Sequence, residues 1–221
     1  MLGKNKILKS ENHDGNYLDV QDIFFTLQGE GPNVGMPAIF IRLGGCNLAC
    51  EFCDTEFESY NRLTLIEILD KIKDILQKKP KTPLVVITGG EPMRQPIAKL
   101  CQKLQDLNLL VQIETNGTIF RDLPKDVQII CSPKINNKKY YPIRPDLLPR
   151  ITAFKFIIEK DGIYNKVCEI GQSQYDIPVY IQPLDRGNLL KNKENLQFAI
   201  KLCLENGYLL SLQTHKIIGL P

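Results

Sequence analysis

The sequence Ala38-Ile39-Phe40-Ile41-Arg42-Leu43-Gly44-Gly45-Cys46 joins a short apolar run to a glycine-rich turn that ends in a cysteine. Short runs of Ile, Phe and Leu bounded by glycine are typical of buried strands. The same arrangement recurs along the chain. It predicts further strands at residues 84–88, 109–114, 127–131, 153–159, 177–182 and 208–212, with another candidate at 17–26.

Between these runs, apolar residues recur at helical spacing over residues 65–76, 96–107 and 196–203. Thr64 and Glu67 form a capping box before the first of these helices, Pro80 and Pro83 close it, and Gly207 can end the last. Strands alternating with helices predict an α/β fold with a parallel sheet. Roughly six strand–helix units are too few for a complete eight-fold barrel of about 250 residues. We therefore expect an incomplete (β/α)6-type TIM barrel, with an open sheet as the alternative.

The chain shows no linker and no internal repeat, so we expect one domain over residues 1–221, with residues 1–37 as an N-terminal extension. Residues 136–149 hold three prolines and predict an irregular segment.

Composition excludes several classes of protein. Lys plus Arg total 28 and Asp plus Glu 25, and a net charge of +3 gives no reason to expect a nucleic-acid partner. No apolar run is long enough to span a membrane, and the start carries no apolar signal segment, so we expect a cytoplasmic protein. An odd count of seven cysteines argues against a disulfide framework.

Polar or glycine-rich clusters follow six of the predicted strands directly. They begin at Gly44, Gly89, Thr115, Ser132, Pro183 and Gln213. The carboxyl ends of parallel strands share one face, where ligands bind in α/β folds. Turn residues alone would explain the glycines and prolines, but not the charged and amide side chains that accompany them. The sequence therefore predicts one site at this face.

Cys46, Cys50 and Cys53 have the spacing C-x3-C-x2-C in one loop. Thiolates bind soft metals and iron–sulfur clusters. Three thiolates can hold three irons of a [4Fe–4S] cube and leave the fourth iron open to a ligand. A zinc site would need a fourth ligand from a distant segment, and three incidental structural thiols are the other alternative. The remaining four cysteines lie among apolar neighbours and are expected to be buried.

The cysteine loop, followed by Gly89-Gly90-Glu91 after the next predicted strand, resembles the radical S-adenosylmethionine superfamily. This resemblance implies that the open iron chelates S-adenosylmethionine. The reduced cluster then cleaves it to methionine and a 5′-deoxyadenosyl radical.

A narrower resemblance extends from about residue 19 to the C-terminus. It rests on Gln28-Gly29-Glu30-Gly31, Cys53-Asp54-Thr55, Thr88-Gly89-Gly90-Glu91-Pro92, Glu114-Thr115-Asn116-Gly117, Ser132-Pro133-Lys134 and Gln182-Pro183-Leu184-Asp185. In this order they are similar to the 7-carboxy-7-deazaguanine synthase family. Relatives commonly carry Trp where this chain has Phe52, which keeps an aromatic face.

The narrower resemblance implies a lyase that converts 6-carboxy-5,6,7,8-tetrahydropterin to 7-carboxy-7-deazaguanine with loss of ammonia, on the route to queuosine. It implies one [4Fe–4S] cluster, S-adenosylmethionine and Mg²⁺ as cofactors. It also implies a homodimer and a flavodoxin or ferredoxin as electron donor.

The same resemblance implies roles for individual residues. Cys46, Cys50 and Cys53 would hold the cluster, and Thr55 the Mg²⁺. The substrate would contact Leu27, Gln28, Gly29, Arg42, Thr88 and Pro221, with Arg42 also in a catalytic role. S-adenosylmethionine would contact Phe52, Cys53, Asp54, Gly90, Ser132, Pro133, Lys134, Gln182, Pro183, Leu184 and Asp185.

Simpler roles stay open for several of these residues. Arg42 can form a structural salt bridge, Lys134 and Asp185 can be solvated loop charges, and Thr55 can cap a turn. Gln213 to Pro221 is expected to close the substrate pocket because Ile217, Ile218 and Leu220 favour docking, although it can instead pack against a helix. For His215 by itself, we expect a structural or surface role.

Two other functions compete. A glycyl-radical-enzyme activase shares the cysteine spacing, but Gln28-Gly29-Glu30-Gly31 and Cys53-Asp54-Thr55 favour the deazapurine family. A non-catalytic iron–sulfur electron carrier would normally use four cysteines for each cluster.

Overall fold

Parallel strands form the centre of the computed structural model, which describes residues 5–53 and 55–220. In spatial order they are β10 (Val179–Pro183), β9 (Ala153–Ile158), β6 (Gln128–Cys131), β5 (Leu110–Thr115), β4 (Leu84–Gly89) and β2 (Pro37–Leu43). Each of these strands lies where the sequence predicted one, with ends that differ by at most two residues. The predicted α/β fold with a mostly parallel sheet is confirmed.

Further strands extend the sheet at both edges. β1 (Tyr17–Leu27) pairs antiparallel with β2, and β3 (Asn61–Thr64), which the sequence did not predict, pairs antiparallel with β1. At the other edge β11 (Leu209–Leu210) pairs parallel with β10. The predicted last strand is therefore shorter than expected. The described residues form a nine-stranded sheet whose edge strands, β3 and β11, are not paired with each other, so the barrel is not closed.

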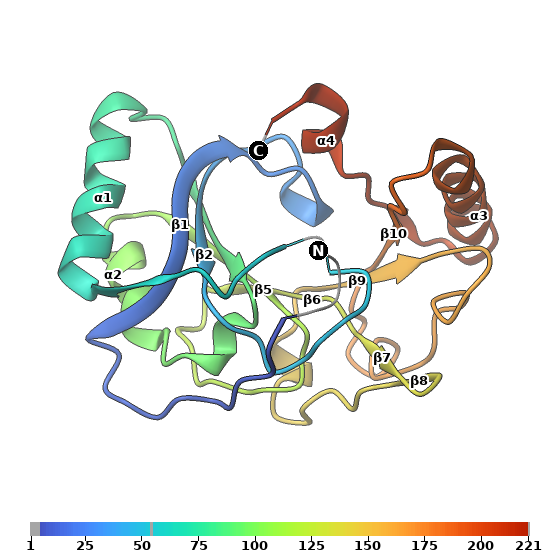
Figure 1. Ribbon diagram of the computed structural model, residues 1–221, viewed down its shortest axis with the longest axis horizontal. Coiled ribbons are helices and arrows are strands. Elements are labelled where there is room, and N and C mark those ends of the chain that lie inside the picture. The colour runs from blue at the N-terminus through green and yellow to red at the C-terminus, as the bar shows by residue number, and fades with distance from the viewer. Residues whose placement is uncertain (1–4, 54, 221) are drawn as a thin grey trace.

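Three long helices lie at the flanks of the curved sheet, with α1 (Leu65–Lys78) and α2 (Ala98–Asp106) on one side and α3 (Leu189–Asn206) on the other (Figure 1). The Thr64 hydroxyl accepts from the backbone N–H of Glu67, and the Glu67 carboxylate accepts in return from the Thr64 N–H. This is the predicted capping box. Gly207 ends α3 in the left-handed conformation with φ 71°, as predicted.

The expectation of roughly six strand–helix units is wrong for three connections. Within the described residues, the segments joining β5 to β6, β6 to β9 and β9 to β10 contain no α-helix. They hold the 3-10 turn η3 (Leu148–Arg150) and a hairpin of β7 (Ile135–Asn136) and β8 (Lys139–Tyr140). Buried side chains from these segments, such as Leu123, Ile143 and Leu147, join the core in place of a helix.

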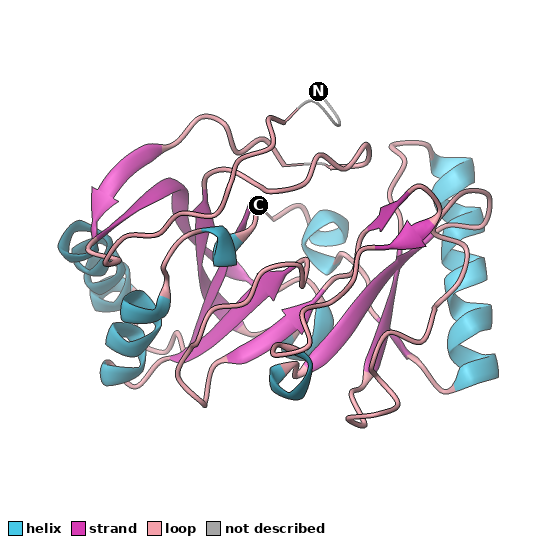
Figure 2. Ribbon diagram, turned by 90° about the horizontal axis from the view of Figure 1, so that it is seen from below, coloured by secondary structure: helices cyan, strands magenta, loops and turns pink. Residues whose placement is uncertain are grey.

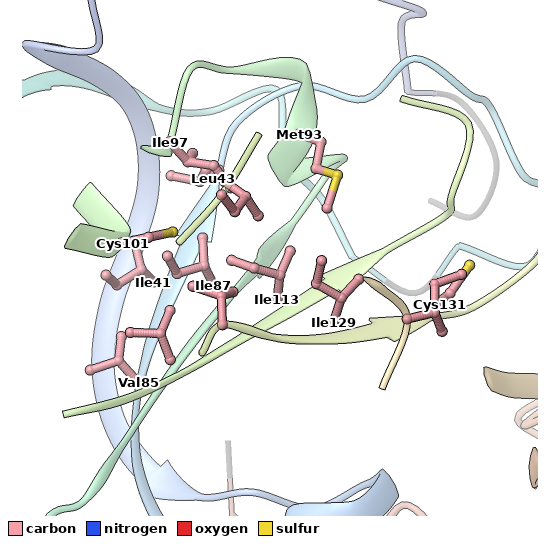
Figure 3. Close-up of a cluster of buried hydrophobic side chains, with 14 of the residues drawn as sticks. Ile41, Leu43, Val85, Ile87, Met93, Ile97, Cys101, Ile113, Ile129 and Cys131 are labelled. Atoms are coloured by element: carbon pink, nitrogen blue, oxygen red, sulfur yellow. The ribbon is translucent and has the colours of Figure 1, made fainter. Parts of the chain in front are cut away.

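The main core lies between the sheet and its helices. Ile41, Ile87, Ile113 and Ile129 from four neighbouring strands lie side by side with Cys101 of α2, and each is at most 1% exposed (Figure 3). Burying each such side chain contributes about 1.5–3 kcal/mol. Cys101 and Cys131 are buried in this apolar cluster as predicted, whereas Cys168 and Cys203, also predicted to be buried, are only half-buried.

Because side chains alternate across a strand, the residues between these core positions point to the other face of the sheet. There Arg42 of β2 stands opposite Thr88 of β4, and both line a cavity. Glu114 of β5, Lys155 of β9 and Gln182 of β10 line a cavity at the same face. The long helices lie outside the sheet (Figure 2), so this polar face looks away from them. None of the helices in the described residues is long and apolar enough to cross a membrane.

Candidate active site

The six clusters that follow the predicted strands meet around one cavity of about 210 Å³. Each cluster supplies at least one lining residue. They are Cys46, Gly90, Asn116, Lys134, Asp185 and Gln213. The convergence expected at the carboxyl face of the sheet is therefore present.

Cys46, Cys50 and Cys53 all line this cavity, and none of them forms a disulfide. Cys46 is buried, and the other two are half-buried in the same small cluster with Leu48 and Phe57. In the described chain, no three Cys, His, Asp or Glu side chains converge closely enough to hold a single metal ion. A [4Fe–4S] cube takes each thiolate on a different iron, so its ligands surround a volume rather than a point. Three free thiols around one cavity fit such a cluster.

Burial raises the pKa of the Cys46 thiol to about 12 and also raises the pKa of Cys50. Cluster ligands must be thiolates, so iron binding has to displace these protons.

Hydrogen bonds from buried side chains fix the start of the cysteine loop. The Arg94 guanidinium donates to the Gly44 carbonyl at 3.1 Å, and the Gln95 amide donates to the same oxygen at 3.2 Å. Further along the loop, Asn47 accepts from Asn116 at 2.9 Å and donates to Thr118 at 2.7 Å. The loop is thus tied to the segments that follow β4 and β5.

Position 90 must be a glycine because the loop after β4 passes very close to the cysteine loop there. A Cβ at Gly90 would lie 1.8 Å from the Gly45 carbonyl oxygen, so no other residue fits without moving the backbone. The adjacent Glu91 N–H donates to that same oxygen at 3.0 Å. The Glu91 carboxylate is buried and accepts from Thr115 and from the Asn116 backbone, both at 2.7 Å. The Gly-Gly-Glu motif therefore holds the loops together around the cavity.

Most residues expected to contact S-adenosylmethionine line this first cavity. They are Phe52, Cys53, Gly90, Ser132, Lys134, Gln182, Pro183, Leu184 and Asp185. Pro133 is buried and is not among the lining residues, and Asp54 lies outside the described residues.

Lys134 and Asp185 are both held by neighbours rather than simply solvated. The Lys134 ammonium donates to Ser132 at 2.6 Å and lies 5.8 Å from the centre of the Phe52 ring. Its burial lowers the pKa of Lys134 despite the opposing effect of Cys50. Asp185 accepts from the Gly187 N–H, from Asn192 and from Lys216, which together lower its pKa to about 2.

A second cavity, of about 280 Å³, adjoins the first. Leu27, Gln28, Gly29, Arg42 and Thr88, all expected to contact the substrate, line it. The two cavities share six wall residues. These are Glu30, Thr55, Thr88, Gly89, Glu114 and Gln213.

Arg42 faces the second cavity with its guanidinium carbon 5.3 Å from the centre of the Phe24 ring. Within the described residues it makes no ion pair with a carboxylate. A guanidinium placed in this way can bind a carboxylate ligand through two parallel hydrogen bonds.

The C-terminal segment docks across the second cavity through polar contacts. Helix α4 (Thr214–Ile218) begins where the Thr214 N–H and hydroxyl donate to the Gly29 carbonyl at 3.0 and 2.9 Å. The expectation that apolar side chains dock it is wrong, because Ile217 is 70% and Ile218 57% exposed. Pro221 lies outside the described residues.

For three residues of this site, the sequence analysis predicted no functional role. His215 lines the second cavity instead of serving only as a surface residue. Glu30 and Lys155 line the first cavity and form a buried ion pair. The signal for Lys155 was a lone lysine between two phenylalanines in a buried strand.

A three-cysteine loop at the carboxyl end of the first parallel strand, in an incomplete α/β barrel, defines a radical S-adenosylmethionine protein. The model of the radical SAM superfamily matches residues 40–135.

The chain belongs to the 7-carboxy-7-deazaguanine synthase family. It is 56% identical to the 7-carboxy-7-deazaguanine synthase of Rickettsia prowazekii, over 100% of this chain and 96% of that protein. It is 38% identical to the enzyme of the same name from Rhodospirillum rubrum, over 99% of each chain. The fold is similar to the crystal structure of QueE from Escherichia coli, with a TM-score of 0.72, 23% identity and coverage of 89% of this chain and 93% of that one. These relatives do not favour the activase or the electron carrier.

Proposed function

We propose that the protein converts 6-carboxy-5,6,7,8-tetrahydropterin to 7-carboxy-7-deazaguanine with release of ammonia. The product and one ammonia together contain the same atoms as the substrate. The reaction therefore consumes no net oxidant or reductant. When bound, the cluster and S-adenosylmethionine supply the radical that begins such a reaction.

One observation carries this proposal. The cavity lined by the three cysteines shares a wall with the cavity lined by Gln28, Arg42 and Thr88. Two ligands bound in these cavities would meet at that wall. Holding two reactants in contact, away from water, is the main contribution that a protein makes to such chemistry.

The residues of the second cavity suit a carboxylated pterin. Arg42 offers a cation for the carboxylate. Gln28 is buried, and its amide donates to Glu114 at 3.1 Å while its oxygen accepts from the Glu30 N–H at 3.1 Å. These bonds fix the orientation of Gln28 beside the ligand. We infer that Arg42, Gln28 and the neighbouring Leu27 and Gly29 bind and orient the substrate.

The residues of the first cavity suit S-adenosylmethionine. Lys134 and Asp185 provide opposite charges for its carboxylate and amino or ribose groups, and Gln182 and Ser132 provide hydrogen-bonding groups. Cys46, Cys50 and Cys53 would hold the cluster between these residues and the loop backbone.

We also propose that Mg²⁺ assists and that Thr55 is its protein ligand. Thr55 is on the wall shared by the two cavities and offers a hard oxygen. A single protein ligand fits Mg²⁺, which keeps several waters or substrate oxygens in its shell.

We propose further that the protein is one domain and works in the cytoplasm as a homodimer. An electron donor such as a flavodoxin or ferredoxin would reduce the cluster. Free thiols in all seven cysteines agree with a reducing compartment.

Anaerobic reconstitution followed by mass spectrometry of the products tests the function. With the carboxy-tetrahydropterin, S-adenosylmethionine and Mg²⁺, we expect 7-carboxy-7-deazaguanine and an equal amount of ammonia. Cys50→Ala should abolish both, while Cys101→Ala, which removes a thiol on α2, should keep the activity if it folds. Product from Cys50→Ala, or none from the reconstituted wild type, would refute the proposal.

A further inference from the structure

Lys155 is a buried lysine between two carboxylates. It is in the middle of β9, its side chain is 6% exposed, and its ammonium makes ion pairs with Glu30 and Glu114. The Glu114 contact measures 3.4 Å. Moving an ammonium group out of water is costly, and the cost is recovered only when opposite charges hold it closely. The two carboxylates are therefore what keeps Lys155 in this position.

The carboxylates come from distant segments of the chain. Glu30 follows β1, whereas Glu114 belongs to β5, and β6 lies between β5 and β9 in the sheet. Lys155 thus links three segments across the cavity side of the sheet. Both carboxylates line the wall shared by the two cavities, and their side chains keep 12% and 19% exposure there.

Both carboxylates retain room for another hydrogen bond. The Glu30 carboxylate accepts from Lys155 and from Gln213 at 2.8 Å. The Glu114 carboxylate accepts from Lys155 and, at 3.1 Å each, from Gln28 and Gln112. An ionised carboxylate has about four acceptor sites, so these bonds leave acceptor capacity on both groups.

The ion pair keeps Glu30 free of protons. Burial by itself raises the pKa of Glu30, but the charge of Lys155, with bonds from Lys155 and Gln213 and the smaller effect of His215, lowers it to about 2. The pKa of Lys155 is raised above its ordinary value because Glu114 and Glu30 outweigh the effect of burial. Glu30 therefore presents hydrogen-bond acceptors and no acidic proton to a ligand.

The lining of the second cavity holds the cations Arg42 and Lys216 and the anions Glu30 and Glu114, and Lys216 is already paired with Asp185 at 3.1 Å. A matching ligand carries a carboxylate at one end and nitrogen-bound hydrogens at the other. We propose that Lys155 is a positioning residue that fixes Glu30 and Glu114 so that they select a 2-amino-4-oxo ring, as in a pterin, over a 2,4-dioxo ring. This inference rests on the proposed function, because that function supplies the ring.

Two stable aromatic probes test the selection by binding alone. 6-Carboxypterin has the 2-amino group, and 6-carboxylumazine has a carbonyl oxygen in its place. Fluorescence titration of the reconstituted protein with S-adenosylmethionine gives Kd for each probe. We expect the wild type to bind 6-carboxypterin at least about tenfold more tightly, because a carboxylate repels the lumazine oxygen and one charged hydrogen bond is lost.

Lys155→Met should bring the ratio of the two Kd values close to one, whereas Lys155→Arg should keep it within about threefold of the wild-type ratio. Lys160→Met is the matched control. It removes an exposed lysine beyond the end of the same strand, paired at 3.7 Å with Glu194, and should leave the ratio unchanged.

Lys155→Met leaves two carboxylates without their cation and can prevent folding. The triple variant Lys155→Met, Glu30→Gln, Glu114→Gln removes all three charges at nearly constant volume and should melt close to the wild type. It too should lose the preference for 6-carboxypterin. A wild-type ratio near one, or an unchanged ratio in either folded variant, would overturn the proposal. Turnover of the wild type is measured separately, so a failure of the proposed function is distinguished from a failure of this selection.

Discussion

Lys216 of α4 donates to the carboxylate of Asp185, beyond β10, at 3.1 Å. The same helix is bonded to Gly29 through Thr214, and Gln213 just before it is bonded to Glu30. The C-terminal segment therefore connects the loop expected to bind S-adenosylmethionine with the segment expected to bind the substrate.

Breaking this connection should weaken substrate binding. Lys216→Met should raise KM for the pterin by about 1.4- to fivefold, because a partly exposed ion pair contributes about 0.2–1 kcal/mol. Lys201→Met, which removes an exposed lysine from α3, is the matched control and should leave KM unchanged. An unchanged KM in Lys216→Met would show that α4 docks without this pair.

Removing residues 219–221 should also raise KM for the pterin while the cluster spectrum and Tm stay nearly constant. A large loss of Tm with an unaltered KM would instead show that this end of the chain only stabilises the fold.

Arg42 should bind the substrate carboxylate. Arg42→Lys keeps the charge but loses the paired hydrogen-bond geometry, so the Kd of 6-carboxypterin should rise about tenfold, and further in Arg42→Met. Pterin without the carboxylate should bind the wild type and both variants with similar Kd. Equal losses for the two ligands would mean that Arg42 shapes the cavity without contacting the carboxylate.

Stability in acid should report the buried ion pair. Since the folded-state pKa of Glu30 is lowered from 4.5 to about 2, its contribution to the free energy of unfolding is fully present above pH 4.5. It is lost as the pH falls from about 4.5 towards 2. In urea unfolding at several pH values, the free energy of unfolding should therefore fall less steeply with acid for Glu30→Gln than for the wild type. Parallel curves for the two proteins would contradict the ionisation assigned to Glu30.

Thr55→Ala should weaken the response of turnover to Mg²⁺ with the cluster spectrum intact. The hydroxyl is a hard oxygen ligand on the shared wall, and its loss should move the Mg²⁺ titration to higher concentration. Thr82→Ala is the control, because it removes a hydroxyl that donates to the Lys79 carbonyl, far along the chain from the cysteine loop, and Thr82 is not among the lining residues of either cavity. An unchanged titration in Thr55→Ala would assign the metal to other ligands.

The sequence was most informative where a local pattern has one physical meaning. The capping box at Thr64, the end of α3 at Gly207 and the cysteine loop all have such patterns, and the structure places them as expected. The alternation of apolar strand-like runs with amphipathic helices likewise predicted the parallel sheet.

Long-range packing could not be predicted in the same way. The connections without helices fill the core with isolated side chains such as Leu123 and Ile143, which have no periodic pattern. The pairing of Lys155 with Glu30 joins residues 125 positions apart, and no local signal identifies such a partner. The docking of α4 depends on backbone and polar contacts. The isoleucines of this helix predicted apolar docking, but they are exposed.

The fate of the hydrogen at C6 of the substrate tests most directly that cofactor and substrate meet at the shared wall. Carboxy-tetrahydropterin carrying deuterium at C6 is turned over anaerobically by the reconstituted protein, and the S-adenosylmethionine that remains is recovered for mass spectrometry. We predict that deuterium appears in its 5′ position while its amount stays constant. Unlabelled S-adenosylmethionine, with one 5′-deoxyadenosine accumulating for each product formed, would contradict the account.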